Sequence, residues 1–177
     1  MKTQRGAAAL LLLLVLLAAV VSLFAAGQPP QDATVRDGQS QRALAEAAQA
    51  LAGYARAQRC EQGVGTVQSH LPCPDQGASE GQAAPSCPGV SRGRLPWRTL
   101  GIAPLRDGHG ECLWYERGPT AARVIAPGLA LAGQSRAASG AAPVCGGHYA
   151  QADYLEAAGN DRALALDPAL LALPAGC

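Results

Sequence analysis

The strongest pattern in the chain is an uninterrupted apolar run close to the N-terminus. Residues 7–26 carry no charge, and Lys2 and Arg5 precede them. A helix of this length measures about 30 Å, which is enough to cross the hydrocarbon of a bilayer. Because basic residues favour the cytoplasmic side, we predict a transmembrane helix over residues 7–26, a cytoplasmic leader over 1–6, and an extracytoplasmic domain beyond them.

A cleaved secretory signal peptide is the alternative interpretation of the same run. Ala25 and Gly27 would supply the small residues at positions −3 and −1 for cleavage after Gly27. The apolar part of such a peptide usually has about 7–15 residues, and this run is longer. We therefore favour a retained anchor, with the rest of the chain exported in either case.

A second helical pattern follows a linker over residues 27–39, where Pro29 and Pro30 interrupt regular structure. Apolar residues then recur at helical spacing while charged residues fall between them. The pattern predicts an amphipathic helix near residues 40–59, at the start of an extracytoplasmic domain over 40–177. The residues of its apolar stripe are Leu44, Ala47, Ala48, Leu51 and Ala55.

The aromatic-rich segment 111–117 and the segment 122–126 read as two strands on either side of a Gly-Pro turn, which predicts an antiparallel hairpin. Residues 63–94 are rich in Gly, Pro, Ser and Gln and predict one long loop. Helix, loop and hairpin in this order predict an α+β fold in which the helix packs on a small antiparallel sheet.

Three later segments complete the expected elements. Residues 133–147 predict irregular structure, and residues 152–158 predict one or two helical turns. Asp167-Pro168 predicts the start of a short terminal helix that runs through Leu173.

Cysteine usage agrees with export. All six cysteines follow the apolar run, and an even set in an oxidising compartment predicts up to three disulfides, for which 15 connectivities are possible. A zinc site is the weaker alternative, because the chain has no CxxC pair and no two histidines at ligand spacing. Considerations of loop closure favour the pairs Cys73 with Cys87, Cys112 with Cys145, and Cys60 with Cys177.

Charge and candidate chemistry give little support to catalysis. The net charge is +1, so no electrostatic footprint for nucleic acid is present. No Gly-x-Ser-x-Gly motif occurs, and we predict no catalytic residue, no cofactor and no enzymatic activity. The histidines, which we expect in solvated loops rather than in a metal site, are His70, His109 and His148.

Two further residue groups each allow two interpretations. Asp75, Ser79 and Glu80 could form a degenerate calcium-binding loop. Calcium usually takes 6–8 oxygen ligands, so an ordinary polar turn is favoured and no metal is predicted. The aromatic residues Trp97, Trp114 and Tyr115 could form a recognition patch, but in a chain with 4% aromatic residues core packing is favoured. Leu95 and Leu100 are expected in the same core.

Several stretches of the chain resemble the type IV pilin and type II secretion pseudopilin superfamily, and more closely a group of pilin-like proteobacterial membrane proteins. They cover most of the chain in sparse patches: Gln4-Arg-Gly-Ala-Ala-Ala-Leu-Leu, Ala52-Gly-Tyr-Ala, Leu71-Pro-Cys-Pro-Asp, Gly93-Arg-Leu-Pro-Trp-Arg-Thr-Leu-Gly, Leu105-Arg-Asp-Gly-His-Gly-Glu-Cys-Leu-Trp-Tyr and Val124-Ile-Ala-Pro-Gly.

The resemblance implies a subunit of the bacterial inner membrane, with a single span and its C-terminal domain in the periplasm or outside the cell. A prepilin peptidase would cut after Gly6 and leave Ala7 as an N-terminus open to methylation. Leu11 stands where pilins usually carry an acidic residue, an acid that tip-type minor pseudopilins can lack. The implied partners are other pilin or pseudopilin subunits, the inner membrane and the peptidase.

These observations lead to three hypotheses for function. A structural minor pilin or pseudopilin-like subunit is the first. The alternative is a periplasmic binding or interaction protein, released by signal peptidase or anchored through its N-terminal segment. An exported hydrolase ranks last, because no site for it is visible in the sequence.

Overall fold

The computed structural model describes residues 33–62, 70–136, 145, 148–155 and 159–167. From Arg36 onward these residues belong to one compact unit. Within the described part of the chain, no helix combines the length and the apolar character needed to cross a bilayer. The predicted span over 7–26, the body of the predicted terminal helix and Cys177 lie outside the described residues.

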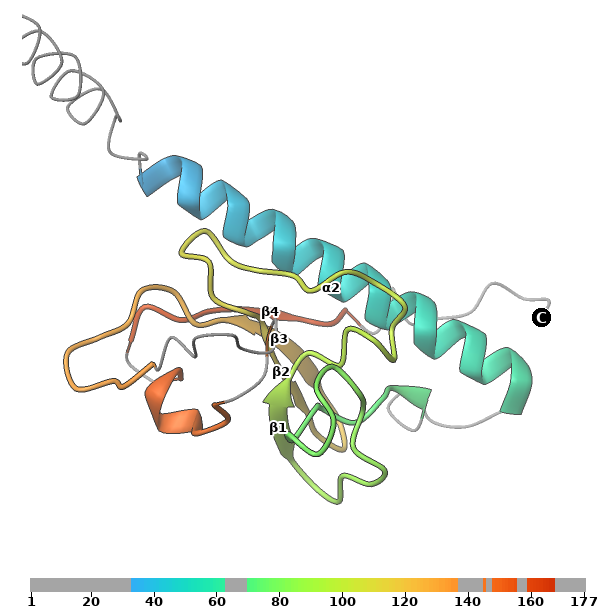
Figure 1. Cartoon of the computed structure of the whole chain (residues 1–177). Coiled ribbons are helices and arrows are strands. Elements are labelled where there is room, and N and C mark those ends of the chain that lie inside the picture. The colour runs from blue at the N-terminus through green and yellow to red at the C-terminus, as the bar shows by residue number, and fades with distance from the viewer. Residues whose placement is uncertain (1–32, 63–69, 137–144, 146–147, 156–158, 168–177) are drawn as a thin grey trace, which may run out of the picture. The chain divides into compact units, whose positions relative to one another are not determined.

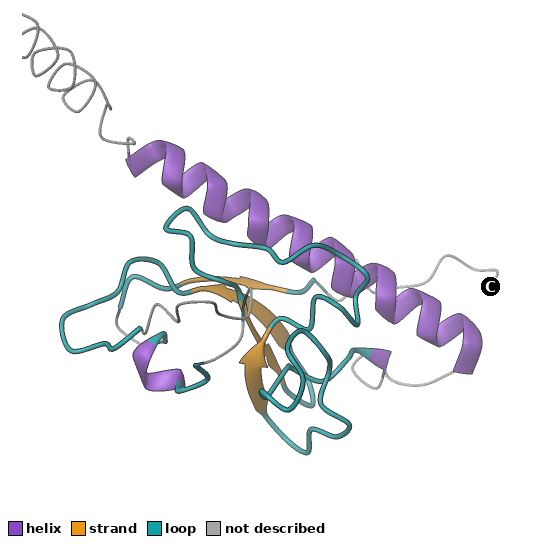
Figure 2. Cartoon of the chain, viewed as in Figure 1, coloured by secondary structure: helices purple, strands orange, loops and turns teal. Residues whose placement is uncertain are grey.

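The described elements form an α+β domain, as predicted (Figures 1 and 2). In chain order they are α2 (Ala33–Gln62), β1 (Ser91–Arg94), β2 (Trp114–Arg117), β3 (Ala122–Ala126), the short 3₁₀ helix η2 (Gln151–Asp153) and β4 (Arg162–Ala165). Helix α2 runs along one side of the sheet, and η2 lies on the other side of the strands (Figure 2).

Helix α2 is longer than the predicted range of 40–59 and includes residues that we expected in the linker. Its early turns gain contacts that no local pattern reveals. Asp37 lies 2.7 Å from a guanidinium nitrogen of Arg162, and the hydroxyl of Ser40 accepts a hydrogen bond from the backbone N–H of Gly108 at 3.0 Å. These contacts offset the helix-weakening effect of Gly38.

The buried face of α2 follows the predicted stripe. The buried residues recur every three or four positions, which places their side chains on one side of the helix. The buried residues are Ser40, Ala43, Leu44, Ala47, Ala48, Leu51, Ala52 and Ala55.

The sheet has four antiparallel strands in the order β1-β2-β3-β4. The predicted hairpin is confirmed, with Trp114 opposite Ile125 and Arg117 opposite Ala122. The prediction of one loop over residues 63–94 is wrong at its end, because β1 pairs there with β2. Strand β4 was not predicted either. Both missed strands lie at the edges of the sheet and depend on their neighbours for pairing.

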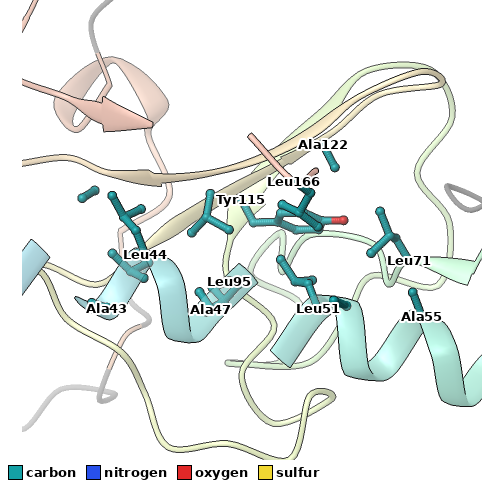
Figure 3. Packing of buried hydrophobic residues seen from close by; sticks show 14 residues of the cluster. Ala43, Leu44, Ala47, Leu51, Ala55, Leu71, Leu95, Tyr115, Ala122 and Leu166 are labelled. Carbon is teal, nitrogen blue, oxygen red and sulfur yellow. The ribbon is translucent and has the colours of Figure 1, made fainter. Parts of the chain in front are cut away.

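The two faces of the sheet bury different residues, because successive side chains of a strand point to opposite sides. On the inner face, Tyr115 and Val124 pack with the buried face of α2 (Figure 3). On the outer face, Trp114 and Ile125 pack against Tyr154 in a second, smaller cluster. The favoured core interpretation is therefore confirmed for Trp114 and Tyr115, which are both fully buried.

The segment after β1 supplies the rest of the core. Leu95 is buried in the main cluster, and Leu100 is partly buried against it, as expected. Trp97 is only half-buried, and the guanidinium of Arg98 lies 4.8 Å from its ring centroid. Of the one or two helical turns predicted over 152–158, the described part contains the short helix η2 and a following turn, and residues 156–158 lie outside the described ranges.

We expect Ala47→Leu to lower the free energy of unfolding by about 1–3 kcal/mol, because Ala47 is fully buried and a larger side chain overpacks the helix–sheet contact. Ala45→Leu, on the exposed face of α2, is the matched control and should change this free energy by less than about 0.5 kcal/mol. Denaturant unfolding of the full chain in detergent micelles measures both, and equal effects would contradict the packing of α2.

Candidate functional site

The candidate site is the loop between Cys73 and Cys87, together with the residues that hold it against the sheet. The predicted disulfides Cys73–Cys87 and Cys112–Cys145 are both present. Cys60 is also disulfide-bonded, while its predicted partner, Cys177, lies outside the described residues. The first bridge closes the loop, and the second ties the chain two residues before β2 to Cys145.

Asp75 is the centre of the loop. Its backbone pairs with that of Arg94 through two hydrogen bonds of 2.9 Å, which continue the sheet beyond β1. Its carboxylate accepts hydrogen bonds from the backbone N–H groups of Gly77 at 2.8 Å and Gly81 at 2.7 Å, and from the hydroxyl of Tyr149 at 2.8 Å. The carboxylate is buried, so these donors replace the water that it loses.

Tyr149 keeps its proton in this arrangement. Burial raises the pKa of its hydroxyl, and the hydrogen bond to the Asp75 carboxylate raises it further. A neutral tyrosine can donate to the carboxylate, whereas a phenolate would repel it. The contact joins residues 74 positions apart in the sequence.

Glu80, the second carboxylate considered for calcium, also has partners within the protein. One of its oxygens accepts a hydrogen bond from the backbone N–H of Cys145 at 2.5 Å, and the other lies 4.0 Å from a guanidinium nitrogen of Arg98. The backbone N–H of Gln82 donates to the carbonyl of Ser79 at 3.0 Å. The segment thus has the bonding of an ordinary polar turn.

Gly93 allows the loop to approach β1. A Cβ atom at this position would lie 2.2 Å from the backbone carbonyl oxygen of Asp75, which is far inside contact distance. Only glycine leaves room for the paired backbones of Asp75 and Arg94 at this point.

Arg94 anchors the outer side of the same region. Its guanidinium lies 4.1 Å from the ring centroid of Tyr154 and 4.6 Å from that of Trp114. It donates to the carbonyls of Cys112 at 3.0 Å and His148 at 3.3 Å. Burial lowers the pKa of Arg94, and the interaction with Tyr154 works against that shift. The aromatic faces and carbonyls stabilise a charge that has lost most of its water.

Asp107 plays a similar role in the turn before β2. Its carboxylate accepts hydrogen bonds from the backbone N–H groups of His109 and Glu111, each at 2.9 Å, and of Gly128 at 2.8 Å. These bonds close the turn that precedes β2. The turn also reaches α2, since a Cβ atom at Gly108 would lie 2.1 Å from the carbonyl oxygen of Arg36.

The three histidines are in different environments. The prediction of a solvated loop is wrong for His70, which is buried and has no hydrogen-bond partner for its ring within the described residues. His109 is exposed. His148 lies 2.6 Å from a carboxylate oxygen of Asp153, whose pKa is lowered by the backbone N–H of Ser135 and by His148.

A pair of arginines shares one carboxylate on the outer face of the sheet. Arg92 forms a short ion pair with Glu116, and Arg123 lies 2.8 Å from the other Glu116 oxygen. Burial raises the pKa of Glu116, but hydrogen bonds from Arg123 and Arg92 outweigh it and leave the pKa lowered.

A pocket of about 330 Å³ adjoins this network. Its described lining combines charged and apolar residues from β1, β3, β4, the turn after η2 and the segment before β4. These residues are Arg92, Arg123, Ile125, Leu155, Gly159, Asp161 and Ala163.

Sequence reasoning selected Asp75 and Glu80 but missed Arg94 and Tyr149, each of which gains its role from a distant contact. Within the described ranges, no three His, Cys, Asp or Glu side chains are grouped as a metal site would require. Comparisons with protein families, with curated proteins and with solved structures gave no match.

We expect Asp75→Asn to lower the free energy of unfolding by about 2–4 kcal/mol, because an amide cannot accept from all three donors with the strength of a carboxylate. Asp37→Asn, which removes a half-exposed ion pair with Arg162, is the control and should cost less than about 1 kcal/mol. Denaturant unfolding in the presence and absence of calcium tests both variants. If calcium raised the free energy of unfolding of the wild type but not that of Asp75→Asn, the assignment of the carboxylate to internal donors would be contradicted.

The stability of the protein should fall in acid partly through Glu116. Because its pKa is lowered in the folded state, its contribution is fully present above its ordinary value of 4.5 and is lost as the pH falls through the folded value. The difference in unfolding free energy between wild type and Glu116→Gln should therefore shrink below about pH 4.5. Glu46→Gln, on the exposed face of α2, controls for the loss of one surface carboxylate.

Proposed function

We propose that the chain is a structural minor pilin or pseudopilin-like subunit of a type IV pilus or type II secretion-type filament. The observation that carries the proposal is the order of elements: an uncharged run over 7–26, then a helix that gives one face to a small antiparallel sheet. The resemblance of the sequence to the pilin superfamily implies the same order. In this proposal the run over 7–26 anchors the subunit in the bacterial inner membrane.

The use of the polar residues in the resembling stretches agrees with a structural role. Asp75 and Asp107 accept hydrogen bonds from the surrounding backbone, and the guanidinium of Arg94 lies against the rings of Trp114 and Tyr154. These side chains hold the loops in place, and their polar groups are engaged in contacts within the protein. A rigid domain is the property that a filament subunit needs from the part outside its apolar helix.

Assembly would use the apolar segment rather than the described domain. Leu and Val side chains of residues 7–26 would leave the lipid and pack against the same segments of neighbouring subunits. Prepilin peptidase would act first, between Gly6 and Ala7. The partners are then the inner membrane, the peptidase and other pilin or pseudopilin subunits.

The pocket beside Arg92 and Arg123 favours the second candidate function, a periplasmic binding or interaction protein. Its mixed lining could hold a small ligand with apolar and polar parts. The charges of both arginines are already shared with Glu116, which weakens their attraction for an anion. The structural proposal therefore remains the first.

Processing of the N-terminus separates the two candidates. We expect the mature protein to begin at Ala7, and Gly6→Leu to leave the leader attached, because a bulky residue would block cleavage next to it. Gly27→Leu is the matched control, since signal peptidase needs a small residue at that point. Intact mass spectrometry of the native protein and of both variants reads the result.

An N-terminus at Gln28 that disappears in Gly27→Leu would sink the filament proposal and support the released protein. If the end at Ala7 is found, its methylation state and co-isolation with other apolar filament subunits test incorporation. If the protein is cleaved before Ala7 but is neither methylated nor co-isolated with such subunits, the membrane anchor stands and the filament role is rejected.

A further inference from the structure

The two described disulfides have different surroundings. Cys112 and Cys145 are both buried. Cys73 and Cys87 are half-buried, and the residues on either side of Cys87, Ser86 and Pro88, are exposed. An external thiol can therefore approach the Cys73–Cys87 bridge more easily than the Cys112–Cys145 bridge.

A cation also lies at the more accessible bridge. One guanidinium nitrogen of Arg117 is 2.6 Å from the sulfur of Cys87 and 3.5 Å from that of Cys73. Arg117 is the last residue of β2 and pairs with Ser91 of β1 and Ala122 of β3. The pairing on both sides fixes its backbone, and its side chain reaches the two sulfurs from that position.

We propose that Cys73–Cys87 is a thiol–disulfide exchange site whose partner is an external dithiol, such as the CxxC pair of an oxidoreductase. The neighbours of Cys87 are the more exposed ones, but attack on Cys73 makes Cys87, the sulfur nearer to Arg117, the leaving group. An incoming thiolate therefore attacks the sulfur of Cys73 and forms a mixed disulfide, while the Cys73–Cys87 bond breaks and its electron pair goes to Cys87. Arg117 stabilises the departing Cys87 thiolate, and a thiol with a lower pKa leaves faster.

The second thiol of the partner completes the exchange. It attacks its neighbour's sulfur in the mixed disulfide, and Cys73 leaves as a thiolate that takes up a proton from solvent. The partner's dithiol is oxidised to a disulfide, and it supplies the two electrons that reduce the bridge. The reverse sequence restores Cys73–Cys87.

The loop keeps its closure without the bridge, which makes the exchange reversible. Inside the disulfide ring, the backbone N–H of Ala84 donates to the carbonyl of Pro74 at 3.2 Å. The hydrogen bonds to Asp75 hold the same segment from within. Reduction therefore removes a covalent tie from a loop that hydrogen bonds still hold in place.

The test uses the oxidised full chain in detergent micelles, with dithiothreitol as the reductant. After timed exposure, free thiols are alkylated and mapped by peptide mass spectrometry. We expect Cys73–Cys87 to be reduced before Cys112–Cys145. Arg117→Gln should slow reduction of Cys73–Cys87 by up to about tenfold, the upper limit for a change of one pKa unit in the leaving thiolate. It should leave the reduction of Cys112–Cys145 unchanged. Arg123→Gln is the matched control.

A second measurement uses only the wild type and so does not depend on whether the Arg117→Gln variant folds. Exposure of the wild type to reduced glutathione, followed by acid quenching, should trap the mixed disulfide mainly on Cys73. Glutathione mainly on Cys87, reduction of Cys112–Cys145 first, or equal rates in folded Arg117→Gln and wild type would each overturn the proposal. Circular dichroism after selective reduction should show an unchanged fold.

Discussion

Strand β2 pairs with β1 on one side and with β3 on the other, and its four residues each make a different kind of contact. Trp114 packs in the outer cluster, Tyr115 lies in the core, Glu116 binds two arginines, and Arg117 reaches the Cys73–Cys87 bridge. A slip of one residue would move every one of these side chains to the opposite face. The register of β2 is therefore the constraint on which the rest depends.

The packing of α2 is what fixes that register. Strands of four or five residues are marginal without a surface to pack on, and the buried face of α2 supplies that surface for Tyr115 and Val124. Most of this face is alanine. Leu44 and Leu51 provide the larger side chains that fill the space between the alanines.

The sequence pattern predicted the elements whose signal is local and missed those that depend on partners. The stripe of α2 and the β2–β3 hairpin follow from spacing and β-propensity. Strand β1 contains only Ser, Arg and Gly, and it is a strand because β2 and Asp75 pair with it. For the same reason, carboxylates could be singled out at Asp75 and Glu80, but their donors at Tyr149 and Cys145 could not.

A chain this poor in aromatic residues holds its loops by other means. Each described disulfide closes a loop, of 14 and 33 residues in sequence separation, and such closures are typically worth about 2–4 kcal/mol each. Asp75 holds part of the Cys73–Cys87 loop through three donors. Asp107, which lies outside both disulfide loops, holds the turn before β2 through three backbone donors. Covalent and hydrogen-bonded ties overlap at the Cys73–Cys87 loop, so the hydrogen bonds would remain as ties if that bridge were opened. The Cys112–Cys145 bridge instead joins segments that are far apart in the chain, so its loss would cost the fold more.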